Sequence, residues 1–358
     1  MKYEIIHFLY LRCVQPVLFK LTPDFIHERV LNVGCFLGGL SFTRYLVQFM
    51  FAYQNPKLEK EVLGIKFKNP VGASAGFDAD GKLVKILPSV GFGFSTVGTV
   101  TNLPYGGNTP PLYTRLIKSK SIVVNKGFKS EGVDVVANRL SDQYLKDKTF
   151  GVSVGSSNVP SINTVEKSIA DYVECFKKLK ESPFIKYFEL NISCPNTDLG
   201  EVFLEPTNFN KLLVSVLSVG LRQPIFVKMP NECRSELMDK LVEIAVSKGI
   251  KGFIFSNLAK DRNNSALLPE DSKKAKDLKG NLSGAPTKEM ANFWIKRYRE
   301  KYGNQIAIIG VGGVFNGKDA KEKLDLGADL VQLVTGLIFE GPQIAGHINF
   351  ELAGGLLN

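Results

Sequence analysis

Near the middle of the chain, a short apolar run ends in side chains that can hydrogen-bond and exchange protons. The segment 187–200 reads YFELNISCPNTDLG, so its apolar stretch gives way to Asn191, Ser193, Cys194 and Asn196. A β-rich run that breaks into polar groups at a Pro-Asn turn is typical of a strand that presents reactive groups at its C-terminal end. Cys194 is the only one of the five cysteines in such a setting. We interpret it as a candidate general acid or base, and the alternative is an inert buried thiol.

Lys228 stands at the end of another apolar run, in the segment FVKMP. Because an unpaired ammonium is costly to bury, a lysine in this place favours an anionic partner, such as a flavin ring that gains negative charge on reduction. The alternative is an ordinary surface lysine. Asn257 ends a further run and Thr99 follows one. Their side chains, like that of Asn191, can hydrogen-bond the pyrimidine edge of a flavin or a ring substrate of similar shape.

Glycines follow the last two apolar runs of the chain. The segment 310–313 reads GVGG, and Thr335 and Gly336 end the final run. Glycines at these two strand ends are typical of the phosphate cradle of a barrel, which is built from bare backbone N–H groups. The alternative, that the glycines only turn the chain, explains one such segment better than it explains two.

These segments belong to a pattern that repeats from residue 64 onward: a short β-branched run, a break rich in Gly, Ser or Asn, and an amphipathic helix. Runs that are apolar on both faces and alternate with helices indicate a parallel sheet covered by helices. Eight such units in about 290 residues predict a closed (β/α)8 TIM barrel, an α/β fold. The alternative, an open doubly wound sheet, lacks the G-x-G-x-x-G expected after its first strand. The predicted strands are 71–76, 94–100, 150–155, 187–193, 225–230, 252–257, 307–313 and 330–336. The predicted helices are 162–180, 208–221, 235–248, 287–302 and 318–326.

Two insertions interrupt this pattern. The first, 101–149, contains the segment NKGF, and the second, 259–282, is dense in Lys, Asp and Asn. We expect the second to form a mobile loop or a small hairpin. In a barrel the active site lies at the C-terminal ends of the strands, so the polar groups described above are predicted to converge on one mouth.

Residues 1–53 differ from the rest of the chain because they are rich in Phe, Leu, Val and Tyr and carry few charges. They predict three helices, of which Pro16 bends or breaks the first and Thr22 and Pro23 begin the second. No stretch reaches the roughly 18 uninterrupted apolar residues of a membrane span. No small-residue cleavage site of a signal peptide follows either. We expect an amphipathic hairpin that lies in the membrane interface. The alternative is a helical cap packed on the main domain, 54–358.

Composition limits the remaining possibilities. With 358 residues, 44% of them hydrophobic and 22% charged, the chain can bury a full core. A net charge of +10 suits nucleic acid or an anionic membrane, but no basic stripe is interleaved with aromatics, so we expect no nucleic-acid binding. The five cysteines include no CxxC pair, which favours a reducing compartment over a disulfide framework or a structural zinc. The three histidines lie near the termini, so we expect no histidine metal site and no Ser-His triad.

As a set, these motifs resemble the dihydroorotate dehydrogenase family and, in their layout, its membrane-associated class 2, which uses quinone. The resemblance covers nearly the whole chain. It runs from LTPDFIHE through FKNPVGASAGFDADG, GTVT, NKGF, NISCPNT, VKMP, NLSG and IIGVGG to LVQLVTGLIFEGP.

The resemblance implies a barrel that holds FMN and a helical extension that admits quinone from the membrane. The implied reaction oxidises (S)-dihydroorotate to orotate in pyrimidine biosynthesis, on the cytoplasmic side of a membrane that the protein binds peripherally. Cys194 falls at the position of the catalytic base, where a thiol needs a pKa lowered towards neutrality; Lys126 and Lys228 are the cations that could lower it. The implied cofactor contacts are Ala75, Gly76, Ala79, Thr99, Ser153, Asn191, Lys228, Ser256, Gly284, Gly312, Gly313, Val334 and Thr335. The implied substrate contacts are Asn125, Lys126, Gly127, Phe128, Asn191, Asn196, Asn257 and Leu258.

The chain departs from the family pattern mainly on the substrate side. Class 2 members generally carry serine where this chain has Cys194. The family lysine that serves both flavin and substrate carboxylate is Ala79, and Lys126 or Lys129 is a possible replacement. The other positions that differ from the family pattern are Val124, Ser153, Leu258 and Val334. Two alternatives therefore stay open: an FMN oxidoreductase of this fold acting on another cyclic amide or enone, and a flavin-binding or empty barrel that acts as a membrane-associated partner without turnover.

Overall fold

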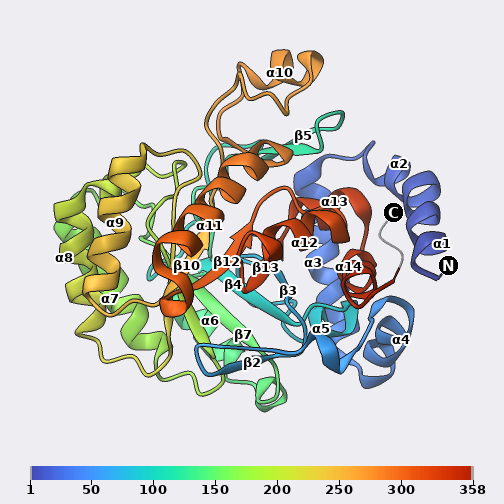
Figure 1. Cartoon of the computed structure of the whole chain (residues 1–358), viewed down its shortest axis with the longest axis horizontal. Helices are drawn as coiled ribbons and strands as arrows, with labels where there is room; N and C mark the ends of the chain where they lie inside the picture. Colours follow the sequence, from blue (N-terminus) through green and yellow to red (C-terminus); the bar gives the residue numbers. More distant parts are fainter. Residues whose placement is uncertain (1, 356–358) are drawn as a thin grey trace.

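Eight parallel strands close into a barrel whose order is β10-β12-β13-β3-β4-β7-β8-β9 (Figure 1). The computed structural model describes residues 2–355. Each strand lies within one of the eight segments predicted from the sequence, so the predicted (β/α)8 fold is confirmed. The strands are β3 Val71–Ala73, β4 Phe94–Val100, β7 Phe150–Val154, β8 Tyr187–Asn191, β9 Ile225–Lys228, β10 Gly252–Phe255, β12 Ala307–Val311 and β13 Leu330–Leu333.

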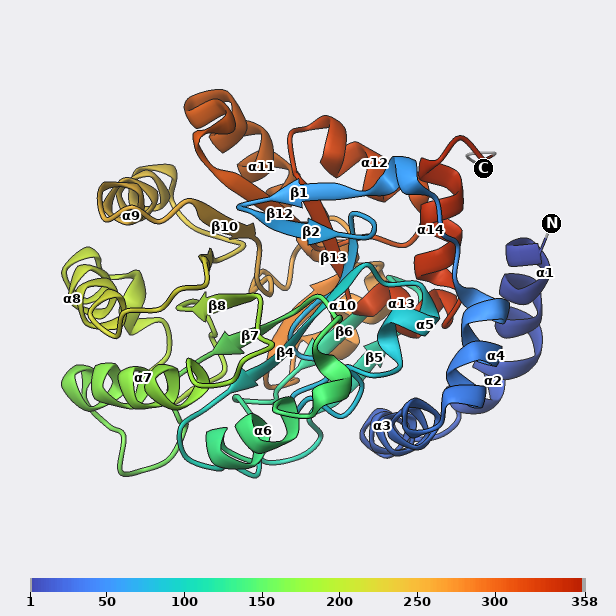
Figure 2. The same ribbon diagram turned by 90° about the horizontal axis from the view of Figure 1, so that it is seen from below.

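Helices form a ring around this barrel (Figure 2). The longer ones follow the sequence pattern: in α7 the side chain of Thr164 caps the first turn by accepting from the Lys167 amide at 3.3 Å, and Tyr172 and Phe176 are buried on the inner face. The helices of the barrel are α5 Leu87–Val90, α6 Val133–Leu140, α7 Val165–Leu179, α8 Pro206–Leu217, α9 Ser235–Ser247, α11 Lys288–Tyr302, α12 Gly317–Asp325, α13 Thr335–Glu340 and α14 Ile344–Leu352. Short 3-10 turns occupy Pro56–Leu58, Gln143–Leu145, Val202–Leu204, Ala285–Thr287 and Gly303–Gln305.

Aromatic side chains plug the barrel at the end where its strands begin. The hairpin of β1 (Lys60–Val62) and β2 (Ile65–Phe67) carries Phe67 against Phe94, with ring centroids 5.0 Å apart. Tyr187 and Phe226 complete this apolar layer, and both are fully buried. This aromatic layer closes one end of the barrel, so the open mouth lies at the C-terminal ends of the strands.

The two insertions build a small sheet over that mouth. Strands β5 (Tyr113–Leu116), β6 (Ser121–Val124) and β11 (Asn281–Gly284) form an antiparallel sheet in the order β11-β6-β5. Helix α10 (Pro269–Ala275) is fastened to the sheet because Asp271 accepts a 2.7 Å hydrogen bond from the Ser119 amide. The prediction of a mobile loop or small hairpin over 259–282 is therefore wrong, because the segment pairs with the first insertion and buries Leu282.

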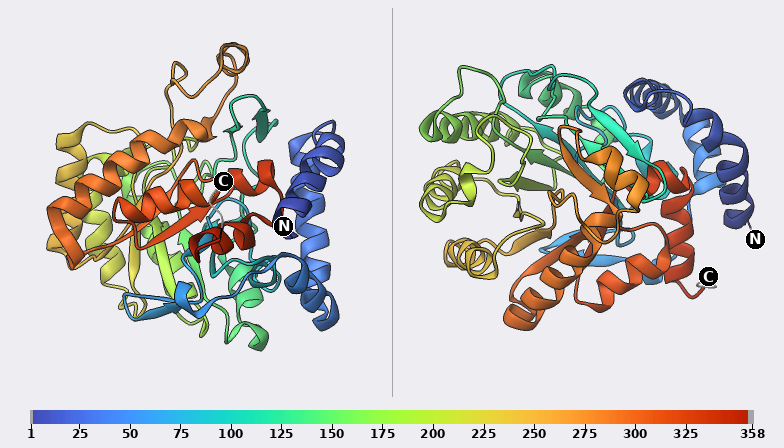
Figure 3. Two further views of the ribbon diagram at one scale, coloured as in Figure 1. Left: turned by 45° about the vertical axis from the view of Figure 1, so that its right-hand side comes forward. Right: turned by 90° about the horizontal axis from the view of Figure 1, so that it is seen from above.

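The N-terminal helices stack along one side of the barrel against its C-terminal helices (Figure 3). They are α1 Lys2–Leu9, a π turn at Tyr10–Val14, α2 Gln15–Leu18, α3 Pro23–Gly39 and α4 Ser41–Phe51. The π turn ends two residues before Pro16, and Pro23 opens α3 as predicted, although the Thr22 side chain makes no capping bond. Tyr10 ties the unit to the barrel by donating to the Ile338 carbonyl at 2.8 Å. His7 contacts Glu340 at 2.8 Å.

These helices expose most of the large hydrophobic side chains on the surface of residues 2–355. Phe42 and Phe49 on α4 are 70% and 71% exposed, and Phe36 on α3 is 67% exposed. Within residues 2–355 no single helix is long and apolar enough to cross a membrane. The pair α3 and α4 meets that requirement only together and is bent by 112°.

Candidate active site

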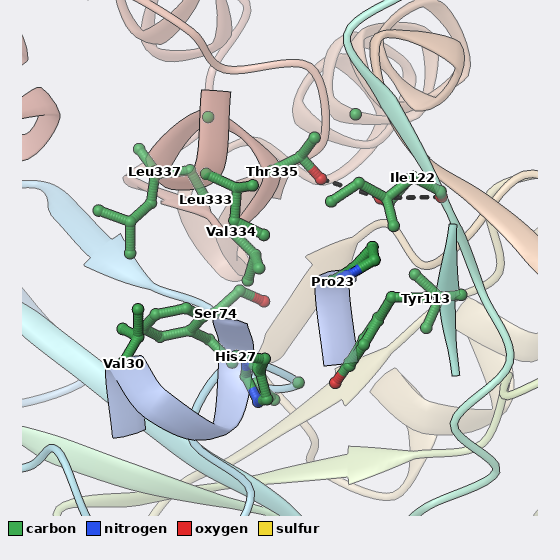
Figure 4. Close-up of a pocket in the computed structure, with 18 of the residues that line it drawn as sticks. Pro23, His27, Val30, Ser74, Tyr113, Ile122, Leu333, Val334, Thr335 and Leu337 are labelled. Atoms are coloured by element: carbon green, nitrogen blue, oxygen red, sulfur yellow. Dashed lines mark hydrogen bonds between the residues drawn. The ribbon is translucent and has the colours of Figure 1, made fainter. Parts of the chain in front are cut away.

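A cavity of about 860 Å³ joins the barrel mouth to the N-terminal helices. Its outer part runs between α3 and the last strand of the barrel, β13, with the helix α13 that follows it (Figure 4). There, His27 and Val30 on α3 face Val334 and Leu337 across the cavity. The barrel end of the cavity is polar, whereas the wall formed by α3 is mainly apolar.

The cavity brings together most of the residues that the sequence nominated. On the predicted cofactor side it is lined by Ala75, Gly76, Thr99, Asn191, Lys228, Ser256, Gly284, Gly312, Gly313, Val334 and Thr335. On the predicted substrate side it is lined by Lys126, Gly127, Phe128, Asn191, Cys194, Asn196, Asn257 and Leu258.

Three nominated residues lie behind this lining. Ala79 is buried away from the cavity. Ser153 is fully buried and reaches the site only through Thr99, whose hydroxyl lies 3.0 Å from its own. Asn125 turns its amide towards the first insertion, where it accepts from Asn108 at 3.0 Å. None of these three side chains lines the cavity.

A chain of amides and hydroxyls forms one wall of the polar end. Asn257 donates to the Asn191 side-chain oxygen at 3.2 Å, and Asn191 donates to the Thr99 hydroxyl at 3.1 Å. Asn257 also donates to the Ser193 hydroxyl at 3.0 Å, and that hydroxyl donates to the Lys228 carbonyl at 2.9 Å. These bonds fix side chains from β4, from β8 and the loop after it, and from the turn after β10 in one orientation, so the wall is preorganised for a planar polar ring.

A second set of amides links the site to the small sheet. Asn196 donates to the Val124 carbonyl at 3.0 Å and accepts from Asn281 at 2.6 Å. Because Val124 and Asn281 belong to β6 and β11, the loop that carries Cys194 is held against both insertions. Asn196 is thereby fixed at the edge of the cavity.

Lys228 is the buried cation of the site. It is 5% exposed, and among the groups of residues 2–355 its ammonium donates only to the Ser74 hydroxyl, at 3.4 Å. Burial lowers the pKa of Lys228, and the charge of Glu189 acts in the opposite direction. A buried ammonium with a single weak partner is an incomplete arrangement that an anionic group in the cavity would complete.

Glycine backbones form the third wall. Gly312 and Gly313 have φ values of +114° and +65°, a left-handed conformation that glycine adopts without strain. A Cβ added at Gly76 would meet nothing within 4 Å, so its backbone faces open space at the cavity. Next to these glycines the Thr335 hydroxyl donates to Ser283 at 2.9 Å. Bare N–H groups and hydroxyls at the ends of β12 and β13 fit a phosphate, and with Lys228 they fit a phosphorylated flavin.

Cys194 is half-buried at the polar end of the cavity. Burial raises the pKa of its thiol to about 12, and the Asn196 amide and the Lys228 charge lower it only in part. A pocket of about 20 Å³ lined by Phe128, Tyr172 and Phe203 adjoins the sulfur. The sequence argument required a pKa lowered towards neutrality. In this structure the shift has the opposite sign, because the apolar surroundings outweigh the cation.

Sequence reasoning assigned no role to the residues where the cavity meets the N-terminal helices. Arg115 on β5 donates to the Leu21 carbonyl at 2.9 Å, and the rings of His27 and Tyr113 lie 5.3 Å apart. Burial lowers the pKa of His27 to about 3, and the charges of Lys126 and Lys129 contribute, so the imidazole is neutral. The motif LTPDFIHE contains His27, but only the fold brings it to Tyr113, some ninety residues away in the chain.

A parallel barrel with a phosphate cradle at its last two strands and a buried lysine beside it is typical of flavin-dependent oxidoreductases. A family model described as dihydroorotate dehydrogenase matches residues 57–356. The chain therefore belongs to the dihydroorotate dehydrogenase family, and its members are generally FMN-dependent oxidoreductases.

Similar proteins cover almost the whole chain. A dihydroorotate dehydrogenase (quinone) of Christiangramia forsetii is 36% identical over 353 residues, covering 96% of this chain and 98% of that protein. One of Trichodesmium erythraeum is 31% identical over 356 residues, covering 95% and 93%. The crystal structure of DHODH from Eimeria tenella in complex with ferulenol superimposes with a TM-score of 0.81 at 26% identity, covering 92% of this chain and 90% of that one. The ligand-free type from the same organism gives a TM-score of 0.80.

Proposed function

We propose that this protein oxidises (S)-dihydroorotate to orotate with FMN as cofactor and a membrane quinone as electron acceptor. The observation that carries the proposal is the single cavity that connects a flavin-type site at the barrel mouth to an apolar passage beside α3. Relatives similar to the chain over nearly its full length are dihydroorotate dehydrogenases (quinone), which supports both the substrate and the acceptor.

The residues of the cofactor side fit FMN. Gly312, Gly313 and Thr335 would hold the phosphate, and Thr99, Asn191 and Lys228 lie where the ring system would extend. When bound, FMN supplies the acceptor for a hydride from the substrate. The Lys228 ammonium would hold a positive charge against the reduced ring.

On the substrate side, Asn191, Asn196 and Asn257 offer the amide groups that a pyrimidine ring requires. Cys194 is assigned as the base: its thiolate removes a proton from one ring carbon as the hydride leaves the neighbouring carbon, so a carbon–carbon double bond forms and the sulfur ends as a thiol. Because the pKa of this thiol is raised to about 12, the reactive thiolate is scarce at neutral pH and a strong base once formed.

The substrate carboxylate needs a cation in this cavity. Ala79 cannot provide one, but Lys126 lines the cavity and extends its ammonium to 3.3 Å from the Gly76 carbonyl. None of the salt bridges among residues 2–355 occupies Lys126, whereas several other lysines on the surface are paired. We assign the carboxylate contact to Lys126.

Residues 1–53 form the membrane-associating part in this proposal, and 54–358 form the FMN-binding barrel. The exposed Phe36, Phe42 and Phe49 suit insertion into the headgroup region, and we propose peripheral association on the cytoplasmic side of a membrane. The passage lined by His27, Tyr113 and Arg115 then leads quinone from the lipid to the flavin.

The proposal is tested by turnover of purified protein in detergent with dihydroorotate and a short-chain ubiquinone. We expect one orotate formed for each quinone reduced, and bound FMN in equal amount to protein. If FMN is bound but dihydroorotate produces no turnover, the substrate is another cyclic amide or enone. Absence of bound FMN would point to a partner without catalytic activity.

A further inference from the structure

Beneath the cavity, the barrel holds a carboxylate that the proposed reaction does not use. Alternate residues of β8 face inward: Tyr187 belongs to the aromatic plug, and Asn191 lines the cavity. Glu189 lies between them and is fully buried. The carboxylate of Glu189 therefore lies directly beneath the cavity, between the aromatic plug and the residues that line the cavity.

Side chains from β4 and β13, which are not adjacent to β8 in the barrel, hold Glu189 by one oxygen only. Its Oε1 atom accepts from the Thr96 hydroxyl at 2.6 Å and from the Gln332 amide at 2.9 Å. Gln332 also donates to Thr96 at 2.9 Å, which closes a triangle across β4, β8 and β13. The Oε2 atom has no hydrogen-bond partner among residues 2–355. A buried carboxylate oxygen without a donor is destabilising unless a positive charge compensates it.

Lys228 supplies a positive charge near this carboxylate, although the two groups form no salt bridge within residues 2–355. On β9 the inward positions are Phe226 and Lys228, and strand register places Glu189 beside Phe226 and Asn191 beside Lys228. The ammonium thus lies one step nearer the cavity than the carboxylate. The charge of Glu189 raises the pKa of Lys228 against the effect of burial. The other titratable groups facing the pair are the Cys194 thiol, whose charge acts on Lys228, and the Tyr187 phenol, whose pKa is raised by burial and by the charge of Glu189.

We propose that Glu189 is a positioning residue for the reaction, whose carboxylate keeps Lys228 protonated beneath the flavin and so sets the pH range in which the flavin is easily reduced. The inference rests on the proposed FMN site. It assigns a role to a residue that neither the motifs nor the residue types at the cavity surface indicate.

The charges predict a definite change when Glu189 becomes neutral. In Glu189→Gln the Lys228 ammonium loses its counter-charge and releases its proton at lower pH. Below that pH, Lys228 is protonated in both the parent and the variant. The variant then has the higher flavin midpoint potential, because it lacks the negative charge of Glu189. At higher pH, Lys228 is deprotonated in the variant but still protonated in the parent, so the midpoint potential of the variant falls below that of the parent.

The experiment measures the midpoint potential of bound FMN against pH for the parent, E189Q, E189D and Y187F. We expect the pH at which the potential changes slope to move down by about one unit or more in E189Q. E189D keeps the negative charge but moves it one methylene group away from Lys228, so its profile should lie between those of the parent and E189Q. Y187F is the matched control, because it removes the hydroxyl that contacts Thr96 at 2.7 Å in the same layer and no charge. Its profile should follow that of the parent.

Identical profiles for the parent, E189Q and E189D would overturn the inference, as would an equal shift in Y187F. If E189Q does not fold, the comparison of E189D with Y187F decides the question in the same way. Failure of the parent to bind FMN contradicts the proposed function rather than this role. In that case the Lys228 ammonium is titrated by nitrogen NMR in the protein without flavin, where E189D should still lower its pKa.

Discussion

The Lys126 ammonium lies 3.3 Å from the carbonyl oxygen of Gly76, so a side chain from the loop after β6 reaches the loop after β3 across the cavity. This contact brings a cation to the site although position 79 is alanine. Lys126→Met is expected to weaken orotate binding by about 10- to 100-fold, the usual effect of losing a hydrogen bond to a charged group. Binding of uracil, which lacks the carboxylate, should not change. Titration calorimetry with both ligands measures the two affinities.

Lys129 provides the matched control for that experiment. It also borders the cavity, but its side chain is exposed and its stem packs near Gly107. Lys129→Met should leave the affinity for orotate within about twofold of the parent, as for a surface charge. Loss of orotate binding in K129M but not in K126M would place the carboxylate on the other lysine.

Lys228→Ala is expected to lose FMN or to slow its reduction by about 100-fold or more, because it removes the positive charge nearest the developing negative charge. The variant also leaves Glu189 buried without its counter-charge. Flavin content after purification and single-turnover reduction by dihydroorotate measure the two effects. Normal flavin content together with normal reduction contradicts the assignment of the cofactor site.

Cys194 should make flavin reduction rise steadily with pH. A thiol whose pKa is raised to about 12 gains roughly tenfold in thiolate for each pH unit below that value. Cys194→Ala should keep FMN and nearly abolish its reduction. Cys194→Ser should keep some activity with its optimum moved to higher pH, because a hydroxyl is harder to ionise. Rapid-mixing measurements across pH test all three, and an alanine variant as fast as the parent would show that another group is the base.

The exposed phenylalanines of α4 should bind the protein to membranes. Phe42→Ser with Phe49→Ser is expected to reduce sedimentation with vesicles of phosphatidylcholine and phosphatidylglycerol, because two aromatic side chains leave the apolar face. Phe293→Ser on α11 is the control, since this exposed residue lies on the barrel, and it should have no effect.

A protein that begins at Gln54 should keep FMN and lose quinone reduction. Equal vesicle binding by all these forms would mean that the helices are only a structural cap.

Glu340 should make the attachment of the N-terminal helices depend on pH. Burial raises its pKa, but hydrogen bonds from His7 and Lys120 outweigh burial and lower it overall. Its stabilising contribution is therefore present above the unfolded-state pKa and is lost as the pH falls through the lower folded-state value. Glu340→Gln should reduce Tm at neutral pH by about 2 °C, and the difference from the parent should shrink in acid. Calorimetric Tm values that differ equally at both pH values contradict this.

The sequence was sufficient for the barrel because its strands are buried on both faces and its helices show a clear apolar period. It also predicted the start of α3, since Pro23 marks its first turn. It failed for 259–282, where polar composition suggested a loop but pairing of β11 with β6 fixed the segment. That pairing joins strands more than 150 residues apart, which no local pattern reveals.

The candidate site was predicted less completely than the fold. Motifs identified most of the cavity lining, but Ala79, Ser153 and Asn125 were placed by position in a motif and lie behind the surface. The pKa of Cys194 is raised rather than lowered because side chains from several elements bury the thiol. The spacing of residues along the sequence does not reveal this burial. Glu189 lies in a predicted strand, and its role depends on which face of that strand points inward.

We expect bound FMN to accept a hydride from dihydroorotate in this cavity. Anaerobic titration of the purified protein with dihydroorotate, followed by flavin absorbance, tests it most directly. We predict that the flavin bleaches completely at one equivalent of dihydroorotate per flavin, with one orotate released, and that added quinone restores the oxidised spectrum. A flavin spectrum that stays oxidised with excess dihydroorotate, in protein that still binds FMN, would contradict the account.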